Sequence, residues 1–328
     1  MMKRMKTVKL LVALLFHGVH VLCSAQNNLE HTEGYKTSGY GAMVSYTKAG
    51  KGKEKLILIA GLGFDGSVFS DFVERNKKSF TMYSVTLPGY GNTTAPPMPD
   101  SAHASYGLQY WNNGAVEGIK KMIEKERLRK PVIVGHFVQG AQIALRLAAE
   151  LPDVVGGVIT VGAPAKFISV MNGQVTEYPL QSSIGYIDKY TAPKWFGPMS
   201  KAKFDQGNYL PEVYSLNTDT GDSLWKISAG VPLPVYIRYL CEFFASDITL
   251  IASQVRCPVL IVRAMFSPQL LHTDVNSYIK PQFIDAWDRM AKANPKIVLK
   301  DVLNSATFIW KDQPAIFDEL VRGFMKLP

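Results

Sequence analysis

Short segments of strand character recur along the chain, and segments in which an apolar residue returns every three or four positions separate them. The strand-like segments lie at residues 40–46, 56–59, 81–86, 132–134, 155–161, 257–262 and 296–302. Runs that are apolar at every position are typical of parallel strands covered on both faces. The periodic segments predict helices at residues 67–75, 111–125 and 139–150. This alternation predicts a doubly wound, mostly parallel α/β sheet with helices on both faces.

The clearest passage from strand to helix lies at residues 131–150, PVIVGHFVQGAQIALRLAAE. Val132–Val134 is fully apolar, and from Gln139 onward the apolar period becomes three and four. Alanines at helical spacing allow this helix to approach a sheet closely. A strand that runs into a helix through a glycine-bounded turn is where the G-x-S-x-G motif puts a catalytic serine, with backbone N–H groups forming part of an oxyanion hole.

The same segment resembles the GHSxGG motif and the Ala-rich helix of the α/β-hydrolase superfamily. Gly135 and His136 fit the motif, and the match resumes at Gly140. Phe137 stands at the serine position, and Gln139 replaces a glycine. Phenylalanine has no nucleophilic atom, so covalent acyl transfer through this position is excluded.

Three further segments resemble the same superfamily. Ala60–Gly63 stands where the family has H-G-x-G, Leu87–Gly91 resembles part of D-x-P-G-x-G-x-S, and Thr307–Pro314 resembles H-F-x-x-x-D-Q-P. The resemblance implies the α/β-hydrolase fold over most of the chain. It also implies that the backbone amides of Leu62 and Val138 are directed at an oxyanion.

The other two positions of the family's catalytic triad are also replaced. Phe266 or Ser267 stands at the acid position, and Thr307 stands at the histidine position. Because the members of a triad act as a unit, the three replacements together predict that the serine mechanism has been lost as a whole. His272 and Asp274 follow closely in the sequence and are candidates for a displaced catalytic pair.

Between residues 167 and 245 the alternation of strands and helices lapses, at the place where the superfamily inserts a lid. This segment is denser in aromatic residues than the chain as a whole. Aromatic rings on a lid above the strand ends predict an apolar chamber that holds a small apolar molecule. The residues expected to line it are Phe137, Trp195, Phe196, Tyr239 and Phe243.

The amino end has the features of an export signal. Basic residues come first, an apolar run at Leu10–Phe16 follows, and Cys23–Ala25 forms a small-residue cleavage site. The apolar run is too short to cross a bilayer, so no stable membrane span is expected. The protein is expected to be periplasmic or secreted. Its expected parts are a signal peptide at 1–25, a leader at 26–38, a core at 39–166 and 246–328, and a lid at 167–245.

Charge and cysteine content change this picture little. The chain has 36 Lys and Arg against 27 Asp and Glu, and removing the four basic residues of the signal would lower the net charge from +9 to +5. The basic residues form no block, so no nucleic-acid partner is expected. Cys241 and Cys257 fit either two free thiols or one disulfide. No paired metal-ligand spacing and no dinucleotide fingerprint occur, so neither a metal nor a cofactor is expected.

Three functions fit these observations. The leading prediction is an exported α/β-hydrolase-fold protein that binds a small apolar ligand under its lid without serine-type hydrolysis. One alternative is an atypical enzyme of the superfamily, either an esterase-like hydrolase or a cofactor-free lyase or oxygenase, that uses displaced residues. The other alternative is a protein-interaction module. The identity of the ligand and the oligomeric state are left open.

Overall fold

The computed structural model describes residues 44–171, 174–271 and 277–326. The expected signal peptide and leader lie outside the described residues, and so do His272 and Asp274. None of the helices in these ranges is long and apolar enough to cross a bilayer.

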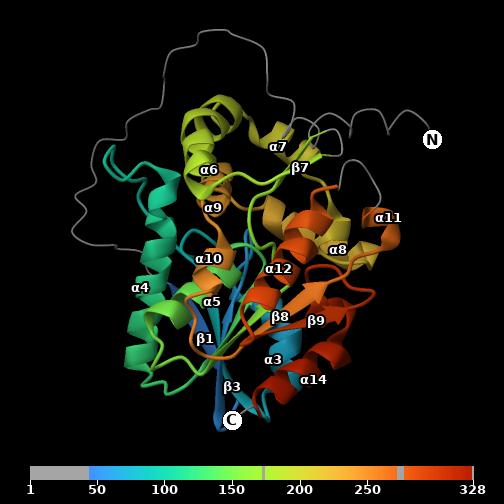
Figure 1. Ribbon diagram of the computed structural model, residues 1–328. Helices are drawn as coiled ribbons and strands as arrows, with labels where there is room; N and C mark the ends of the chain where they lie inside the picture. The colour runs from blue at the N-terminus through green and yellow to red at the C-terminus, as the bar shows by residue number, and fades with distance from the viewer. Residues whose placement is uncertain (1–43, 172–173, 272–276, 327–328) are drawn as a thin grey trace.

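A seven-stranded sheet forms the centre of the fold (Figure 1). Its strands in spatial order are β1 (Ser45–Ala49), β3 (Phe80–Thr86), β2 (Glu54–Ile59), β4 (Val132–His136), β5 (Gly157–Val161), β8 (Val259–Ala264) and β9 (Ile297–Val302). All neighbouring strands are parallel except β1, which pairs antiparallel with β3. The predicted mostly parallel sheet is therefore confirmed, and β4 and β5 are buried along their whole length because helices cover both faces.

The helices that cover the sheet come from widely separated parts of the chain. Figure 1 shows α4 and α5 on one face of the sheet and α3 and α14 on the other. On the second face, the rings of Phe72 and Phe317 join α3 to α14, with centroids 5.3 Å apart. The helices and helical turns outside residues 167–245 are η1 (Gly66–Phe69), α3 (Ser70–Asn76), η2 (Tyr106–Leu108), α4 (Tyr110–Lys125), α5 (Gln139–Glu150), α10 (Ile248–Ala252), α11 (Pro268–Leu271), η6 (Pro281–Asp285), α12 (Ala286–Ala293), α13 (Ile309–Asp312) and α14 (Pro314–Phe324).

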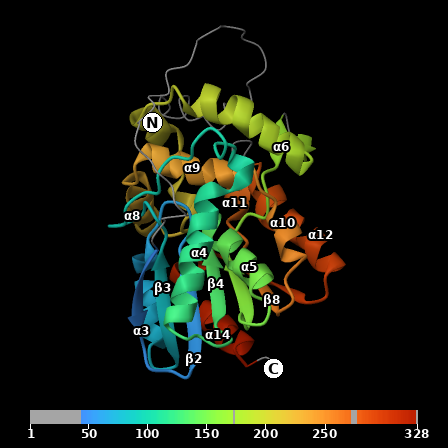
Figure 2. The same ribbon diagram turned by 90° about the vertical axis from the view of Figure 1, so that its left-hand side faces the viewer.

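The described part of residues 167–245, called the cap segment below, consists of a short hairpin followed by helices. Figure 2 shows α6 and α9 of this segment at the end of the sheet opposite the start of β2. Its elements are β6 (Ser169–Met171), β7 (Gln174–Thr176), α6 (Leu180–Tyr186), η3 (Ile187–Phe196), α7 (Lys201–Gly207), η4 (Pro211–Val213), α8 (Thr218–Ala229) and α9 (Leu233–Phe244).

Two local predictions differ from the structure. The first strand runs to Ala49 rather than ending at Tyr46. The reason is that β1 stays paired with β3 until Ala49 lies opposite Met82, and the turn begins only at Gly50, whose φ is 88°. The sequence also favours Asp312 as the N-cap of the last helix. Asp312 instead ends α13, and its carboxylate accepts hydrogen bonds from the Ser215 hydroxyl and from the backbone amides of residues 216 and 306.

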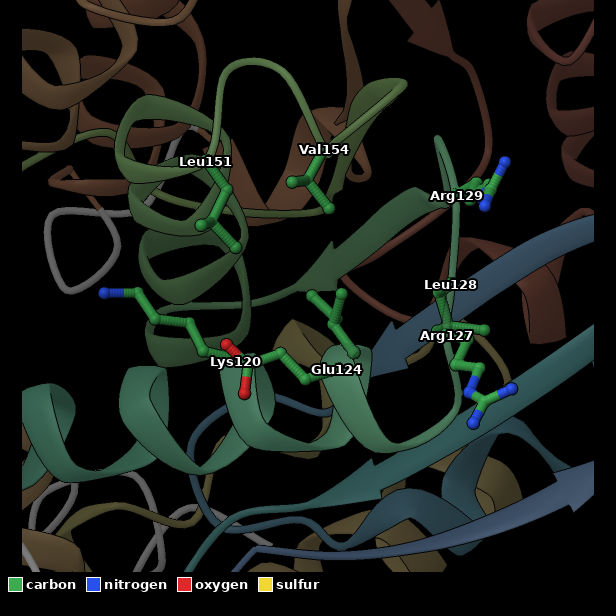
Figure 3. A pocket seen from close by; sticks show the side chains of 8 residues that line it. Lys120, Glu124, Arg127, Leu128, Arg129, Leu151 and Val154 are labelled. Carbon is green, nitrogen blue, oxygen red and sulfur yellow. The ribbon is translucent and has the colours of Figure 1, made fainter.

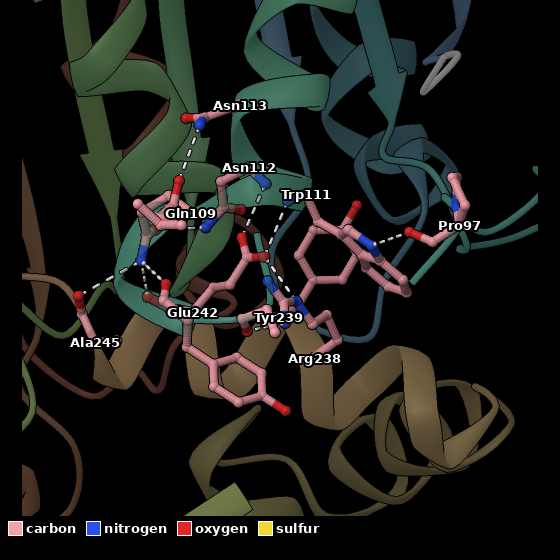
Figure 4. Close-up of polar contacts among 12 residues, drawn as sticks. Pro97, Gln109, Trp111, Asn112, Asn113, Arg238, Tyr239, Glu242 and Ala245 are labelled. Atoms are coloured by element: carbon pink, nitrogen blue, oxygen red, sulfur yellow. Dashed lines mark hydrogen bonds and ion pairs between the residues drawn. The ribbon is translucent and has the colours of Figure 1, made fainter. Parts of the chain in front are cut away.

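The cap segment is fastened to the core by the buried carboxylate of Glu242 on α9 (Figure 4). Its two oxygens accept hydrogen bonds from the backbone amides of Trp111 and Asn112, each at 2.9 Å, in the first turn of α4. These amides have no partner within their own helix, and a negative charge is favourable at a helix N-terminus. Arg238, one turn earlier on α9, donates its Nε to the same carboxylate at 2.9 Å. Burial raises the pKa of Glu242, and Arg238 and the two amides oppose that shift.

Replacing Glu242 with alanine should lower the free energy of unfolding by about 3–5 kcal/mol, because it leaves the buried Arg238 charge without a carboxylate and two buried helix amides without acceptors. Urea denaturation of the wild type and of Glu242→Ala would measure the loss. Glu117→Ala is the matched control, since Glu117 is a partly exposed residue of α4 paired with Lys120 and its loss should cost about 1 kcal/mol or less. Equal losses in the two variants would contradict the proposed role of Glu242.

Candidate functional site

The sharp turn between β4 and α5 has the backbone of a nucleophile elbow. Phe137 has φ of 35° and Val138 has φ of 56°, a region that bulky and β-branched residues rarely enter. Each residue held in such a backbone conformation destabilises the fold by about 1–3 kcal/mol, and it persists only where the surrounding structure holds it in place. Gly61 is one of these surroundings, because a Cβ at that position would lie 2.2 Å from the Phe137 carbonyl oxygen. The turn is also held by the Phe137 amide, which donates to the Val161 carbonyl at 3.1 Å.

The amides of Leu62 and Val138 lie beside this turn. Both residues are buried, and none of the described residues accepts a hydrogen bond from either amide. Buried backbone N–H groups are almost always paired, so two unpaired ones at adjoining turns are unusual. These are the two amides for which the sequence predicts the role of an oxyanion hole.

The side chains at the nucleophile and acid positions form an aromatic cluster. The Phe137 ring stacks on the Phe283 ring, with centroids 6.3 Å apart. The Phe266 ring also contacts Phe283, in an edge-on arrangement with centroids 5.4 Å apart. Phe137 also meets Tyr214 edge-on at 6.2 Å. The fold therefore brings the two positions together, with carbon rings in place of a nucleophile and an acid.

The histidine position and the second acid candidate are both engaged in local hydrogen bonds. Thr307 is fully buried, and its hydroxyl donates to the Val213 carbonyl at 2.8 Å. Ser267 precedes α11 and its hydroxyl accepts from the Leu270 amide at 3.2 Å. Neither side chain is in a position to take a proton from a nucleophile at the elbow.

The residues expected to line a ligand chamber lie in different places. Tyr239 is buried between cap segment and core, where its hydroxyl donates to the Pro88 carbonyl at 2.9 Å. Phe243 is buried on the same helix. Trp195 and Phe196 pack within the cap segment, in an apolar cluster that is separate from the one that contains Phe137. The structure therefore does not gather these five side chains around one space.

The sequence did not point to Ser228, a polar residue beside the turn that contains Leu62 and Gly63. Ser228 Oγ lies so close to the turn that a Cβ on Gly63 would be 2.4 Å away from it, and the Tyr214 hydroxyl donates to Ser228 Oγ at 3.3 Å. Burial raises the pKa of Tyr214 and of Tyr236, so both phenols stay protonated and act as hydrogen-bond donors. The aromatic density of the cap segment was a signal for these residues, but it was interpreted only as apolar lining.

Gln139 and His136 flank the elbow and serve the packing around it. Gln139 donates its side-chain amide to the Tyr239 carbonyl and so connects α5 to α9, while its own carbonyl oxygen has no partner among the described residues. His136 is enclosed by aromatic rings, with Phe308 at 4.4 Å and Trp310 at 4.7 Å between centroids. Burial lowers the pKa of His136 to about 3, against a smaller opposing effect of the Thr307 backbone. His136 is therefore neutral at physiological pH and a weak base.

A hollow of about 340 Å³ lies far from this site, at the amino ends of the strands (Figure 3). It is lined by residues at the end of α4 and in the loops before β4 and β5, namely Lys120, Ile123, Glu124, Arg127, Leu128, Arg129, Leu151 and Val154. It is not the chamber expected under the lid.

Within the described residues, neither a disulfide nor a metal-binding group contributes to the site. Cys241 and Cys257 are both buried free thiols, so the structure contains no disulfide between them. Within the described ranges, no group of three His, Cys, Asp or Glu side chains is arranged to hold a metal ion.

Comparisons with known proteins place the fold among hydrolases. No family model matches the chain. Acyl-protein thioesterase 1 of Debaryomyces hansenii is 28% identical over 188 residues, which cover 49% of this chain and 76% of that protein. A pimeloyl-[acyl-carrier protein] methyl ester esterase of Vibrio vulnificus is 29% identical over 112 residues, 34% of this chain and 38% of that protein. The chain thus matches well under half of the Vibrio enzyme.

Solved structures agree over nearly the whole fold. An esterase from Exiguobacterium antarcticum superposes with a TM-score of 0.64 at 15% identity and covers 88% of this chain and 97% of its own. The enol-lactonase from Burkholderia xenovorans gives a TM-score of 0.61 at 14% identity, with 88% and 98% covered. The chain therefore has the α/β-hydrolase fold that was expected from its sequence.

These comparisons contradict the leading functional prediction. The relatives are named as a thioesterase and as esterases, and the structural neighbours as an esterase, a lactonase and other hydrolases, so the expectation of a ligand-binding protein without hydrolysis is wrong. The physical reason is that Phe137 excludes one mechanism, covalent catalysis by serine, and leaves hydrolysis by another route open.

The burial of His136 should make the protein less stable in acid. Its folded-state pKa of about 3 lies below the ordinary value of 6.5, so its contribution is fully present above pH 6.5 and is lost as the pH falls toward 3. The free energy of unfolding should fall by up to about 1.4 kcal/mol per pH unit in this window because of this residue alone. Denaturation at several pH values should show a flatter profile for His136→Leu than for the wild type. The exposed His103 supplies the control, and a flatter profile in His103→Gln as well would contradict the assignment.

Proposed function

We propose that the protein is a hydrolase for a carboxylic ester or thioester, in which water takes the place of the serine nucleophile. The observation that carries the proposal is the retained elbow with two buried, unpaired amides, those of Leu62 and Val138. The names of the relatives support the substrate class, since one is an acyl-protein thioesterase and another a methyl ester esterase.

The reaction needs no covalent bond to the protein. The substrate carbonyl oxygen binds at the amides of Leu62 and Val138, and water attacks the carbonyl carbon while giving up a proton to a base. The negative charge that forms on the oxygen is stabilised by the two amides. The C–O or C–S bond then breaks, the leaving alcohol or thiol takes the proton, and a carboxylic acid remains. Preorganised donors alone accelerate such reactions by about 10³–10⁴ over water, so turnover is expected to be slow.

Aromatic and polar neighbours of the turn have distinct roles in this proposal. Phe137, Phe266 and Phe283 supply an apolar surface for the acyl part of the substrate. Ser228 lies beside the turn that contains Leu62 and Gly63, and because its oxygen accepts a hydrogen bond from Tyr214, its own hydroxyl hydrogen is the one that donates to the substrate. The cap segment acts as the lid over this site.

The base is assigned to residues that the structure does not describe. Among the described neighbours of the elbow, His136 has too low a pKa, and the buried tyrosines keep their protons. We assign the base to the displaced His272, with Asp274 as its partner. Export through the segment 1–25 remains part of the same proposal.

Gly61→Ala should lower kcat/KM by about 10²–10³, because the added Cβ would displace the turn that presents the Leu62 amide. The rates are to be measured with p-nitrophenyl esters and acyl thioesters, on proteins purified in parallel. Gly323→Ala is the matched control, since a Cβ there meets no atom within 4 Å. Equal rates in all three proteins would point to a contaminating esterase and contradict the proposal.

A fluorophosphonate should fail to label the wild-type protein under conditions in which it hydrolyses esters, because Phe137 offers no oxygen for phosphonylation. Intact-mass spectra during turnover should show no acyl-enzyme. His272→Ala should lower kcat/KM by about 10²–10⁴ through loss of the base. Stoichiometric labelling of the wild type would show that a hidden nucleophile carries the reaction and would refute water attack.

A further inference from the structure

The amino ends of the parallel strands form a strongly basic face. Parallel strands begin at one edge of a sheet, so the loops before β2, β3, β4, β8 and β9 meet there. Backbone hydrogen bonds join these loops sideways, from Lys51 to Lys77 and from Val259 to Lys296. Figure 2 shows the start of β2 at the bottom of the molecule, opposite α6 and α9. This surface is called the amino-end face below.

Exposed cations without a carboxylate partner collect on the amino-end face. They come from loops far apart in the sequence and are Lys51, Lys53, Lys78, Arg127, Arg129, Lys130, Arg256 and Lys296. Among the described residues, none of them forms an ion pair, although many other cations of the chain do. The nearby acidic residues are fewer: Glu54, Glu124 and Asp153 are exposed, and Glu126 is already bound by Lys48.

We propose that the amino-end face adsorbs to a membrane surface that contains anionic phospholipids. Several unpaired cations on one face, with few acids between them, are the charge pattern that anionic headgroups attract. The rest of the molecule can then stay in water, with the elbow at the opposite end of the strands, away from the lipid. The hollow in Figure 3 lies at the border of this face, with Arg127 and Arg129 on its rim and Leu151 and Val154 inside.

The composition of the face favours a lipid surface over the other polyanions. Binding of single-stranded nucleic acid depends on aromatic rings that stack on bases. In the described part of the chain, the exposed large apolar side chains all lie outside the loops of this face. A second copy of the chain would set cations against cations, so self-association through this face is unfavourable.

Vesicle flotation with the full chain tests the proposal. The wild type should float with vesicles of phosphatidylcholine and phosphatidylglycerol at low salt and remain unbound with phosphatidylcholine alone. Salt at about 1 M should release it, because the Debye length falls to about 3 Å. The triple variant Lys53→Glu, Lys78→Glu, Arg129→Glu should bind at least about tenfold more weakly.

A matched triple variant distinguishes the effect of charge on the amino-end face from the effect of the protein's net charge. Lys189→Glu, Lys203→Glu, Lys226→Glu makes the same change in net charge with exposed cations of the cap segment, and it should keep binding within about threefold of the wild type. Circular dichroism should show that both variants are folded. Equal losses in the two variants, salt-resistant binding to neutral vesicles, or tighter binding to single-stranded DNA than to anionic vesicles would each overturn the proposal. Ester hydrolysis is measured separately, and a failure of either proposal leaves the other standing.

Discussion

The buried carboxylate of Glu242 is the contact on which the placement of the cap segment depends. A helix needs partners for its first amides, and α4 obtains two of them from a residue on a helix more than a hundred positions later in the chain. Arg238 and the Gln109 side chain complete the junction from the same side. Because α9 also carries Tyr239, to which Gln139 of α5 donates, the junction extends to the elbow. The position of the cap segment and the start of α5 are therefore set together.

The elbow shows that the architecture of a catalytic turn can persist without its nucleophile. Phe137 and Val138 keep strained backbone angles, and close contacts at Gly61, Gly135 and Gly140 leave no space for a relaxed path. The nearest atom in each case is a backbone oxygen, so the close approach does not depend on the ring of Phe137. The same packing leaves the amides of Leu62 and Val138 unpaired. Phe137 excludes the covalent step of serine catalysis, while two unpaired amides remain beside the turn.

The sequence predicted the features that depend on local pattern. The apolar runs of β2, β4 and β5 and the periodicity of α5 fixed the sheet and its main crossover, because burial on both faces leaves a clear signal. It failed where a residue's role depends on distant partners. Asp312 binds residues around position 215 and 306 instead of capping a helix, and Tyr214 meets Ser228 beside a turn formed by Gly63. The functional prediction was wrong for another reason, because replacement of the three triad positions excludes the serine mechanism and leaves other routes to hydrolysis open.

The clustering of charge on the folded protein is likewise not visible in the order of residues along the sequence. The basic residues form no block along the sequence, and this spacing led to the expectation that no nucleic acid binds. A parallel sheet, however, brings the start of every strand to one edge, so single cations such as Lys53, Lys78 and Arg256 become neighbours through topology alone. The carboxyl ends of the same strands carry the elbow and the oxyanion turn. In a protein built in this way, the length of the strands separates the charged surface from the site. At physiological ionic strength, electric fields in water decay within about 8 Å. Binding through one end therefore leaves the electrostatics of the other end nearly unchanged.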